Sequence, residues 1–282
     1  MMDYHFADQV AVITGGGRGL GQAFAQALAQ AGAAVVSVAR SEGQLRDAVQ
    51  AIEQAGGRAL AFTADVTDRQ AIEHVVAEVQ QQLGHVDLLV NTAGVFRALG
   101  PIAEVDPDGW WREVEINVRG TYLCTRAVLP GMLARQQGRI INLASAAGLQ
   151  SIPLTSAYCV SKTAVIRLTE SLALETSNQG IRFFAMHPGT VRTPMSNYAA
   201  ESDEVKQRAP FVQQWFQQLY REGGDTPIER SVELMMLLAS GKADALSGRY
   251  IDVDDDLDGL LQQADAIERD DLYTLRLRTH KE

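Results

Sequence analysis

A tyrosine and a lysine four residues apart form the pair in this chain that is best suited to proton transfer. Tyr158 and Lys162 belong to the run Tyr-Cys-Val-Ser-Lys, inside a stretch, 157–176, whose pattern predicts a helix. Residues four apart share one face of a helix, so the lysine ammonium would lower the tyrosine pKa from about 10. Such a phenol can give a proton to a carbonyl oxygen or take one from an alcohol near neutral pH.

Two further polar residues are expected near this pair. Ser145 directly follows the apolar run 139–144, which would put its hydroxyl at the carboxyl end of a strand, where open α/β sheets bind ligands. The alternative for this serine is a strand-end cap. Asn117 interrupts the apolar part of a predicted helix, where an amide is unfavourable. It is either a buried, hydrogen-bonded amide or a kink that orders a water molecule.

A glycine-rich turn indicates phosphate binding. The run Thr-Gly-Gly-Gly-Arg-Gly-Leu-Gly at 14–21 joins the first apolar run to an amphipathic stretch. Gly15 would permit a tight turn, Gly19 would let the backbone approach a pyrophosphate, and Gly21 would let the helix pack closely on the sheet. The amino terminus of that helix would attract the anion. The spacing differs from the commonest dinucleotide fingerprint, and the alternative is a flexible turn without a ligand.

The residue after the second apolar run bears on the type of dinucleotide. NAD sites usually carry an acidic residue there to hold the ribose hydroxyls, whereas this chain has Ala39 followed by Arg40. Arg40 and Arg18 together could grip a 2′-phosphate through bidentate hydrogen bonds. We therefore expect NADP(H) in preference to NAD(H). The alternative is that Arg40 is a solvated surface charge.

Short apolar runs that alternate with amphipathic stretches must position these residues. The runs are 10–14, 34–39, 59–64, 86–91, 139–144, 181–186 and 249–253. Apolar strands separated by helices predict a seven-stranded parallel sheet covered on both faces, a single Rossmann-like, doubly wound α/β domain over 1–282. We expect two additions to it: a polar and aromatic lid at 195–227, and a charged, helical extension at 259–282.

Composition excludes several other classes of protein. The chain has 282 residues, 46% of them hydrophobic, a formal net charge of −10 and 2 cysteines. Disorder and a disulfide scaffold are excluded, and an acidic chain is a poor partner for nucleic acid. No apolar run approaches the roughly 20 residues of a membrane span, and the first residues do not read as a secretory signal. We expect a protein of the reducing cytoplasm.

Together these motifs resemble the short-chain dehydrogenase/reductase family over about residues 7–253. Besides the glycine turn, the matching residues are Asp65-Val66, Asn91-Thr92-Ala93-Gly94, Asn117, Ser145, Tyr158 with Lys162, and Pro188-Gly189-Thr190-Val191-Arg192-Thr193, in the family's order. The resemblance implies that Tyr158 is the general acid/base and that Ser145 bonds the substrate oxygen. Lys162 would bond the nicotinamide ribose and lower the Tyr158 pKa. Asn117 would hold a water that links Lys162 to solvent.

The same resemblance implies a set of cofactor-binding residues. They are Gly15, Gly17, Arg18, Gly19, Leu20 and Arg40 at the phosphates, Asp65 and Val66 at the adenine, Asn91, Ala93 and Gly94 beside the adenosine and ribose, Tyr158 and Lys162, and Pro188, Gly189, Val191 and Thr193 at the carboxamide. The chain departs from the family at Thr92, where asparagine is common, and at Gly17, where a hydroxyl often stands beside the 2′-phosphate. The end of the last strand and the longer tail also differ.

The expected activity is NADP(H)-dependent reduction of a ketone, or oxidation of a secondary alcohol, by hydride transfer. The aromatic stripe of Phe211, Trp215 and Leu219, with Phe96, Leu149 and Ile152, would favour a bulky apolar or aryl substrate. The stripe could instead merely pack on the core. Other possible functions are an NAD-dependent alcohol dehydrogenase, a 3-oxoacyl-carrier-protein reductase and a non-enzymatic dinucleotide sensor. Family members often form tetramers through two long helices, here 108–134 and 157–176, so we expect a homo-oligomer, either a tetramer or a dimer.

An acidic run near the end of the chain imitates a calcium loop. Asp254, Asp256 and Asp258 alternate before Gly259, but a strand and not a helix precedes them. We expect a solvated acidic turn and no metal site. From the resemblance and the composition, we expect a small ketone or alcohol as the partner, and neither nucleic acid nor a membrane.

Overall fold

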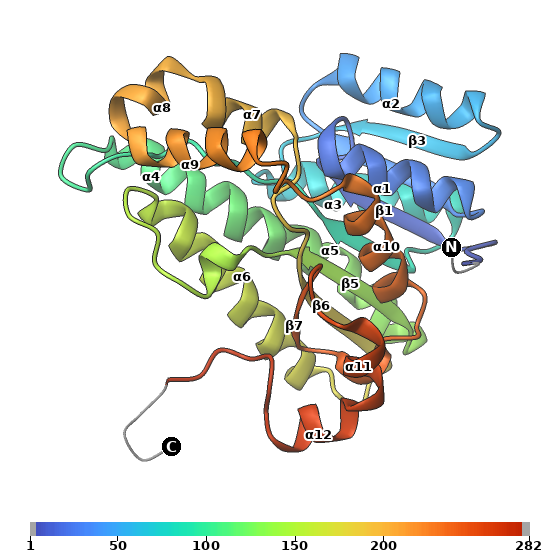
Figure 1. Cartoon of the computed structure of the whole chain (residues 1–282). Helices are drawn as coiled ribbons and strands as arrows, with labels where there is room; N and C mark the ends of the chain where they lie inside the picture. The colour runs from blue at the N-terminus through green and yellow to red at the C-terminus, as the bar shows by residue number, and fades with distance from the viewer. Residues whose placement is uncertain (1–3, 278–282) are drawn as a thin grey trace.

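The seven apolar runs form seven parallel strands of one sheet in the computed structural model, which describes residues 4–277 (Figure 1). The strands are β1 (Val10–Thr14), β2 (Ala34–Ala39), β3 (Arg58–Thr63), β4 (Leu88–Asn91), β5 (Gly138–Leu143), β6 (Ile181–His187) and β7 (Tyr250–Asp252). Their order is β3-β2-β1-β4-β5-β6-β7. The predicted fold class is confirmed, and each strand end lies within two residues of its expected position.

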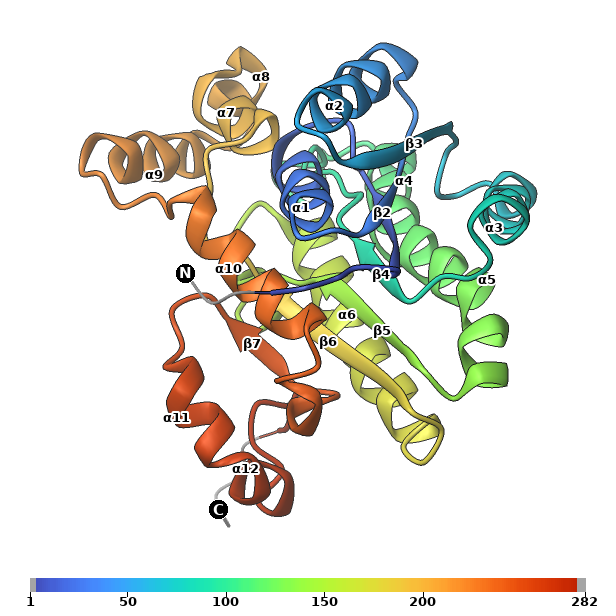
Figure 2. The same cartoon turned by 90° about the vertical axis from the view of Figure 1, so that its right-hand side faces the viewer.

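Helices cover both faces of the sheet (Figure 2). One face carries α1 (Gly19–Gln30), α2 (Glu42–Gln54) and α10 (Ile228–Ala239), and the other carries α3 (Arg69–Leu83), α5 (Gly120–Arg135) and α6 (Ser156–Glu175). Each helix buries an apolar stripe; Leu45, Ala48 and Ile52 are the buried residues of α2. Burial of such stripes on both faces of the sheet produces two hydrophobic cores.

The helix expected at 108–134 is divided into three segments. They are α4 (Pro107–Val114), a π-helical segment, η1 (Glu115–Arg119), and α5. Asn117 lies in the π-helical segment, and its side chain bonds the backbone of Val95 instead of lying passively in the helix. A π-helical turn is a wider turn that inserts one residue, so the expected single regular helix is wrong at the position where the asparagine interrupts the pattern.

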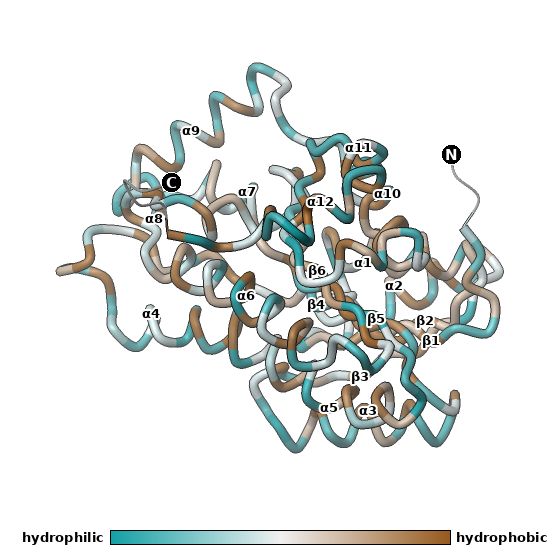
Figure 3. Tube along the Cα trace, turned by 90° about the horizontal axis from the view of Figure 1, so that it is seen from below, coloured by the Kyte–Doolittle hydropathy of each residue, from teal (hydrophilic) through white to brown (hydrophobic). Residues whose placement is uncertain are grey.

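The lid region folds into three short helices, α7 (Pro194–Glu201), α8 (Asp203–Arg208) and α9 (Pro210–Arg221), which stand together at one end of the molecule in Figure 1. Along α9, hydrophobic and hydrophilic residues alternate (Figure 3). Val212 and Gln213 are its buried residues, whereas Phe211 and Trp215 are about half exposed. The stripe therefore does not pack simply on the core.

The charged tail is helical only in its first part. It contains α11 (Leu257–Gln262) and α12 (Ala264–Arg269), and residues 270–277 then run as an irregular strap. This segment forms hydrogen bonds with other elements. The backbone amide of Leu275 donates to the Glu170 carboxylate on α6, and the backbone amide of Tyr250 on β7 donates to the Tyr273 carbonyl. These bonds replace helical ones, so the prediction of a helix is wrong for 270–277, and 278–282 lie outside the described residues. Within 4–277, no helix combines the length and apolar character needed to cross a bilayer.

The connection of the strands determines where a ligand can bind. From β1 the chain moves outward through β2 to β3, and β4 then returns to the other side of β1. The loops that follow β1 and β4 therefore leave the sheet in opposite directions. They open a crevice at the carboxyl ends of these strands, which is where open α/β sheets bind ligands.

Candidate active site

A cleft of about 790 Å³ occupies this crevice. Most residues predicted to hold a cofactor line it: Gly15, Gly17, Arg18, Gly19, Leu20, Arg40, Asp65, Val66, Ala93, Gly94, Tyr158, Lys162, Pro188, Gly189, Val191 and Thr193. Ser145 lines it as well, whereas Asn91 and Asn117 do not. Segments far apart in the sequence thus meet around one elongated space.

The glycine turn has the geometry that a phosphate site requires. Gly15 and Gly19 both have left-handed backbone conformations, with φ of 68° and 57°, which residues with a side chain rarely adopt. A Cβ atom on Gly21 would lie 2.4 Å from the carbonyl oxygen of Gly15, so only glycine lets α1 begin this close to the strand end. The free amides at the start of α1 consequently border the cleft.

Thr92 ties the two loops together where the family commonly has asparagine. Its hydroxyl donates to the carbonyl of Thr14, and the hydroxyl of Thr14 accepts a bond from the Ala93 amide. The two residues join the end of β1 to the end of β4 across the crevice. Threonine therefore makes the connection between the two strand ends at this position.

Two arginines and one carboxylate mark the end of the cleft nearest β2 and β3. Arg18 and Arg40 are exposed side chains that line the cleft, and neither forms an ion pair with any residue of 4–277. Asp65 accepts bonds from the Thr67 amide and from Arg112, the latter at 2.7 Å. Burial raises the pKa of Asp65, but these hydrogen bonds and the charge of Arg112 lower it overall. Asp65 is thus held as an anion.

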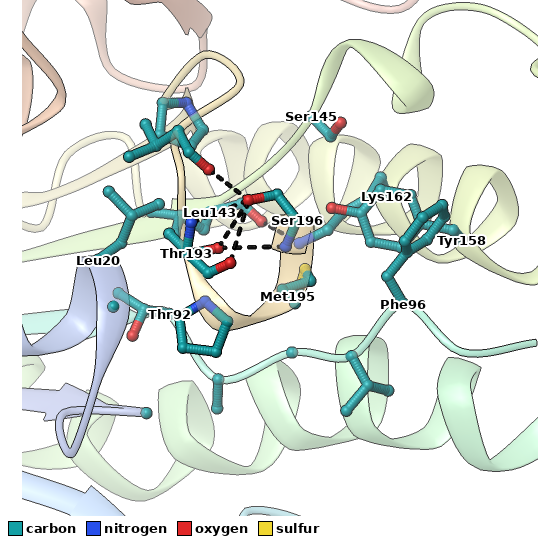
Figure 4. Close-up of a pocket in the computed structure, with 18 of the residues that line it drawn as sticks. Leu20, Thr92, Phe96, Leu143, Ser145, Tyr158, Lys162, Thr193, Met195 and Ser196 are labelled. Atoms are coloured by element: carbon teal, nitrogen blue, oxygen red, sulfur yellow. Dashed lines mark hydrogen bonds between the residues drawn. The ribbon is translucent and has the colours of Figure 1, made fainter. Parts of the chain in front are cut away.

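Tyr158 and Lys162 lie side by side on α6, as the sequence predicts (Figure 4). The Lys162 Nζ atom lies 5.5 Å from the centre of the Tyr158 ring and donates to the carbonyl oxygen of Leu143 at 2.7 Å. Ser145 follows β5, and its Oγ accepts a bond from the Ala147 amide, so the strand-end cap is present. Its position in the cleft also leaves it beside Tyr158.

The electrostatics of this pair differ from the prediction. Burial of the Tyr158 hydroxyl raises its pKa, and this effect exceeds the lowering by hydrogen bonding with Ser145. Burial likewise lowers the pKa of Lys162 to about 8, against the opposing influence of Glu113. The pKa of Tyr158 is therefore raised overall and not lowered as predicted, because the loss of hydration on burial outweighs the contacts that favour the phenolate.

Two predicted site residues, Asn91 and Asn117, lie outside the cleft lining. The side-chain amide of Asn91 donates to the hydroxyl of Thr125 and, at 2.8 Å, to the side-chain oxygen of Asn142, both inside the protein. The side-chain oxygen of Asn117 accepts from the backbone amide of Val95, and its side-chain nitrogen donates to the Val95 carbonyl and to the Ser161 hydroxyl. Both are buried side-chain amides whose hydrogen bonds join separate elements. Asn117 is thus a buried, hydrogen-bonded amide that also lies where the helix departs from regular geometry, and a water held by it stays a prediction.

Glu113 is a buried carboxyl group that sequence reasoning missed. It is only 1% exposed, and its Oε2 accepts bonds from the amides of Arg97 and Ala98 at 2.5 and 2.8 Å. Burial raises its pKa, while the two amides and the charge of Lys162 lower it. In the sequence it stands among Trp, Arg and Glu residues and resembles a surface position, so no pattern there signals its burial.

Aromatic residues form the wall of the cleft near Tyr158. The Phe96 ring meets the Tyr158 ring edge-on with centroids 4.8 Å apart and lies 6.4 Å from the Phe216 ring. Trp215 packs on Phe216 and also lines the cleft, as does Ile152. Leu149 was predicted to join this wall, but the short helical turn after Ser145 directs it outward, and it is exposed.

The acidic turn has protein partners instead of a metal-binding arrangement. Asp254 pairs with Arg230 at 2.9 Å, and Asp256 caps α11 by accepting from the Gly259 amide. Within residues 4–277 no cluster of three or more His, Cys, Asp or Glu side chains has the arrangement to hold a metal ion.

Comparison with known proteins agrees with this geometry. The profile of the family described as short chain dehydrogenase matches residues 9–204. A short chain dehydrogenase of Pseudocercospora fijiensis is 34% identical over 279 residues, covering 95% of this chain and 89% of the relative. Two solved structures are similar: actinorhodin polyketide ketoreductase with NADPH, at 32% identity and TM-score 0.75 (87% of this chain, 95% of that one), and NAD⁺-bound xylitol dehydrogenase, at 27% and 0.78 (88% and 98%). This chain therefore belongs to the short-chain dehydrogenase family of oxidoreductases, which act on hydroxyl and carbonyl groups.

Proposed function

We propose that this protein is an NADP(H)-dependent oxidoreductase that reduces a ketone or, in the reverse direction, oxidises a secondary alcohol. The observation that carries the proposal is the meeting of Ser145, Tyr158 and Lys162 in the same cleft as the glycine turn. The left-handed glycines and the free amides of α1 fit a pyrophosphate. A bound nicotinamide would supply the hydride to the carbonyl carbon.

Tyr158 would give the proton that the carbonyl oxygen needs. Its raised pKa keeps the phenol protonated at neutral pH, which suits proton donation in the reducing direction. Ser145 would hold the carbonyl oxygen by a hydrogen bond while negative charge develops on it. Lys162 would stabilise the tyrosinate that is left and bond the ribose. Asn117 would support the site through Val95 and Ser161, without touching the substrate.

Replacement of Tyr158 by phenylalanine tests this role. We expect Tyr158→Phe to lower kcat about 1,000-fold while the Kd for NADPH, measured by titration calorimetry, changes less than threefold. Tyr273→Phe alters an exposed tyrosine outside the cleft lining and is the matched control. Retained turnover in Tyr158→Phe would overturn the mechanism. A loss of NADPH binding would mean that the tyrosine acts on the cofactor site instead.

The choice of NADP(H) rests on Arg18 and Arg40. Both lie at the end of the cleft, and no carboxylate of residues 4–277 pairs with them. The similar solved structures carry NADPH in one case and NAD⁺ in the other, so the family alone leaves both cofactors open. A ratio of kcat/KM for NADPH over NADH well above one is expected. A ratio below one would favour an NAD-dependent alcohol dehydrogenase.

The substrate would be a bulky apolar or aryl ketone. The aromatic wall of Phe96, Trp215 and Phe216 offers apolar contact beside Tyr158, and the lid can exclude water from hydride transfer. A panel of aryl ketones, steroids, sugars and small alkanones, followed by NADPH absorbance, tests this class. Higher kcat/KM for sugars than for aryl ketones would contradict it.

We also infer a homo-oligomer in the cytoplasm. Exposed apolar side chains, among them Trp111, Tyr122, Val160 and Leu174, lie on α4, α5 and α6, which favours burial against another copy. The free cysteines, Cys124 and Cys159, suit a reducing compartment. Light scattering after size exclusion should give a dimer or tetramer mass, and cell fractionation should place the protein in the cytoplasm; a monomer or a secreted protein would contradict these inferences.

A further inference from the structure

We infer that Glu113 is a positioning residue that clamps the loop carrying Phe96 and thereby sets the shape of the substrate cleft beside Tyr158. The inference deepens the proposed function and rests on it for its kinetic consequences. Glu113 lies in α4, outside the cleft lining and outside the motifs that mark the family in this sequence.

Two side chains on successive helical turns hold this loop from either side of Phe96. Asn117, in η1, brackets the residue before Phe96 by bonding both the amide and the carbonyl of Val95. Glu113, four residues earlier, accepts from the next two amides, those of Arg97 and Ala98. Every residue from 95 to 98 other than Phe96 is therefore bonded to one of these two side chains. The bonds on either side of Phe96 therefore fix the position of its side chain.

Phe96 connects the loop held by Glu113 to Tyr158. Phe96 is 8% exposed, and its ring packs edge-on against the Tyr158 ring (Figure 4). The ring of Phe216, in the lid, lies 6.4 Å from the Phe96 ring. The same loop packs Leu99 with Ala199, Val205 and Val212 of the lid helices. A shift of the loop would therefore move the aromatic wall relative to Tyr158 and loosen its packing against the lid.

A buried carboxyl group is a costly way to hold a loop unless its bonds are needed. Two amide donors point at one oxygen of Glu113, and without this acceptor the buried Ala98 amide and the partly buried Arg97 amide would both lose their partner. The other oxygen, Oε1, has no hydrogen-bond partner within residues 4–277. The loop thus uses one acceptor oxygen and does not need a second. A glutamine offers the same acceptor without the charge, and a methionine offers similar bulk without a strong acceptor.

This difference defines the experiment. Glu113→Gln and Glu113→Met are compared, with Asp108→Asn, an exposed carboxylate of the same helix, as the control. In Glu113→Met we expect KM for 2-tetralone to rise about tenfold, KM for acetone to change less than threefold, and the Kd for NADPH to stay unchanged. Glu113→Gln and Asp108→Asn should match the wild type within twofold. In a Phe96→Ala background, Glu113→Met should have no further effect.

Hydrogen exchange supplies a readout that does not depend on turnover. The amides of Arg97 and Ala98 should exchange at least tenfold faster in Glu113→Met than in the wild type, and at the wild-type rate in Glu113→Gln. If Glu113→Met fails to fold, Glu113→Asp, whose shorter side chain cannot reach both amides, takes its place with the same expectations.

The clamp is overturned if the methionine variant affects both ketones equally, if the glutamine variant loses as much as the methionine variant, or if loop exchange is unchanged. Failure of the proposed function has a different signature, because the wild type would then reduce no ketone of the panel, while the exchange comparison would still decide whether Glu113 holds the loop.

Discussion

Lys162 should reduce the stability of the folded protein at neutral pH. It is 7% exposed, and burial lowers its pKa from 10.5 to about 8. In the unfolded chain the lysine keeps its proton up to about pH 10.5, whereas in the folded protein it loses the proton near pH 8. Between these values the unfolded state binds more protons, so the free energy of unfolding rises with pH. Below pH 8 the folded protein carries the full cost.

The size of this effect follows from the shift. A difference of about 2.5 pH units, at 1.36 kcal/mol for each, corresponds to about 3 kcal/mol. Lys162→Met removes the titrating group, and the pH dependence of its stability lacks this contribution. We therefore expect the stability of the wild type to rise by about 3 kcal/mol relative to Lys162→Met between pH 7 and pH 10.5. The variant should also lose most of its activity.

Urea denaturation followed by tryptophan fluorescence measures this difference at half-unit pH intervals. The change with pH does not depend on how well methionine packs, because packing contributes equally at each pH. Lys206→Met, which removes an exposed lysine of α8, is the control and should run parallel to the wild type. Parallel curves for the wild type and Lys162→Met would refute the reasoning, since they would mean that the folded protein leaves the lysine pKa unperturbed.

Three further predictions concern other parts of the cleft. Arg40→Ala should raise KM for NADPH about tenfold and leave KM for NADH unchanged. Arg46→Ala, which removes an exposed arginine, is the control. Equal effects on both cofactors would contradict a contact between Arg40 and the 2′-phosphate. Trp215→Ala should lower kcat/KM about tenfold for aryl ketones and less for acetone, and unchanged values for both would end the lid hypothesis. Gly21→Ala should lower the Tm by about 5 °C and weaken NADPH binding, because its Cβ would meet the Gly15 carbonyl; calorimetry that shows wild-type values would disprove the close packing.

The elements and the motifs that depend on local pattern were predictable. Apolar runs such as 86–91 became strands because branched apolar residues between turn signals favour strand pairing. The positions of Gly15 and Gly19 in the turn reflect backbone conformations that only glycine adopts easily. Tyr158 and Lys162 share a face because helical geometry brings residues four apart together.

Only the tertiary structure decided what surrounds those residues. The direction of the Tyr158 pKa, the inward position of Glu113 and the structural use of Asn91 all depend on burial by segments distant in sequence. The tail, too, leaves its helix to bond Glu170 and Tyr250. Spacing along the chain determines which side chains can meet within one helix or strand. Packing between elements determines how much water reaches each titratable side chain, and therefore its pKa. A local sequence pattern holds no information on that packing.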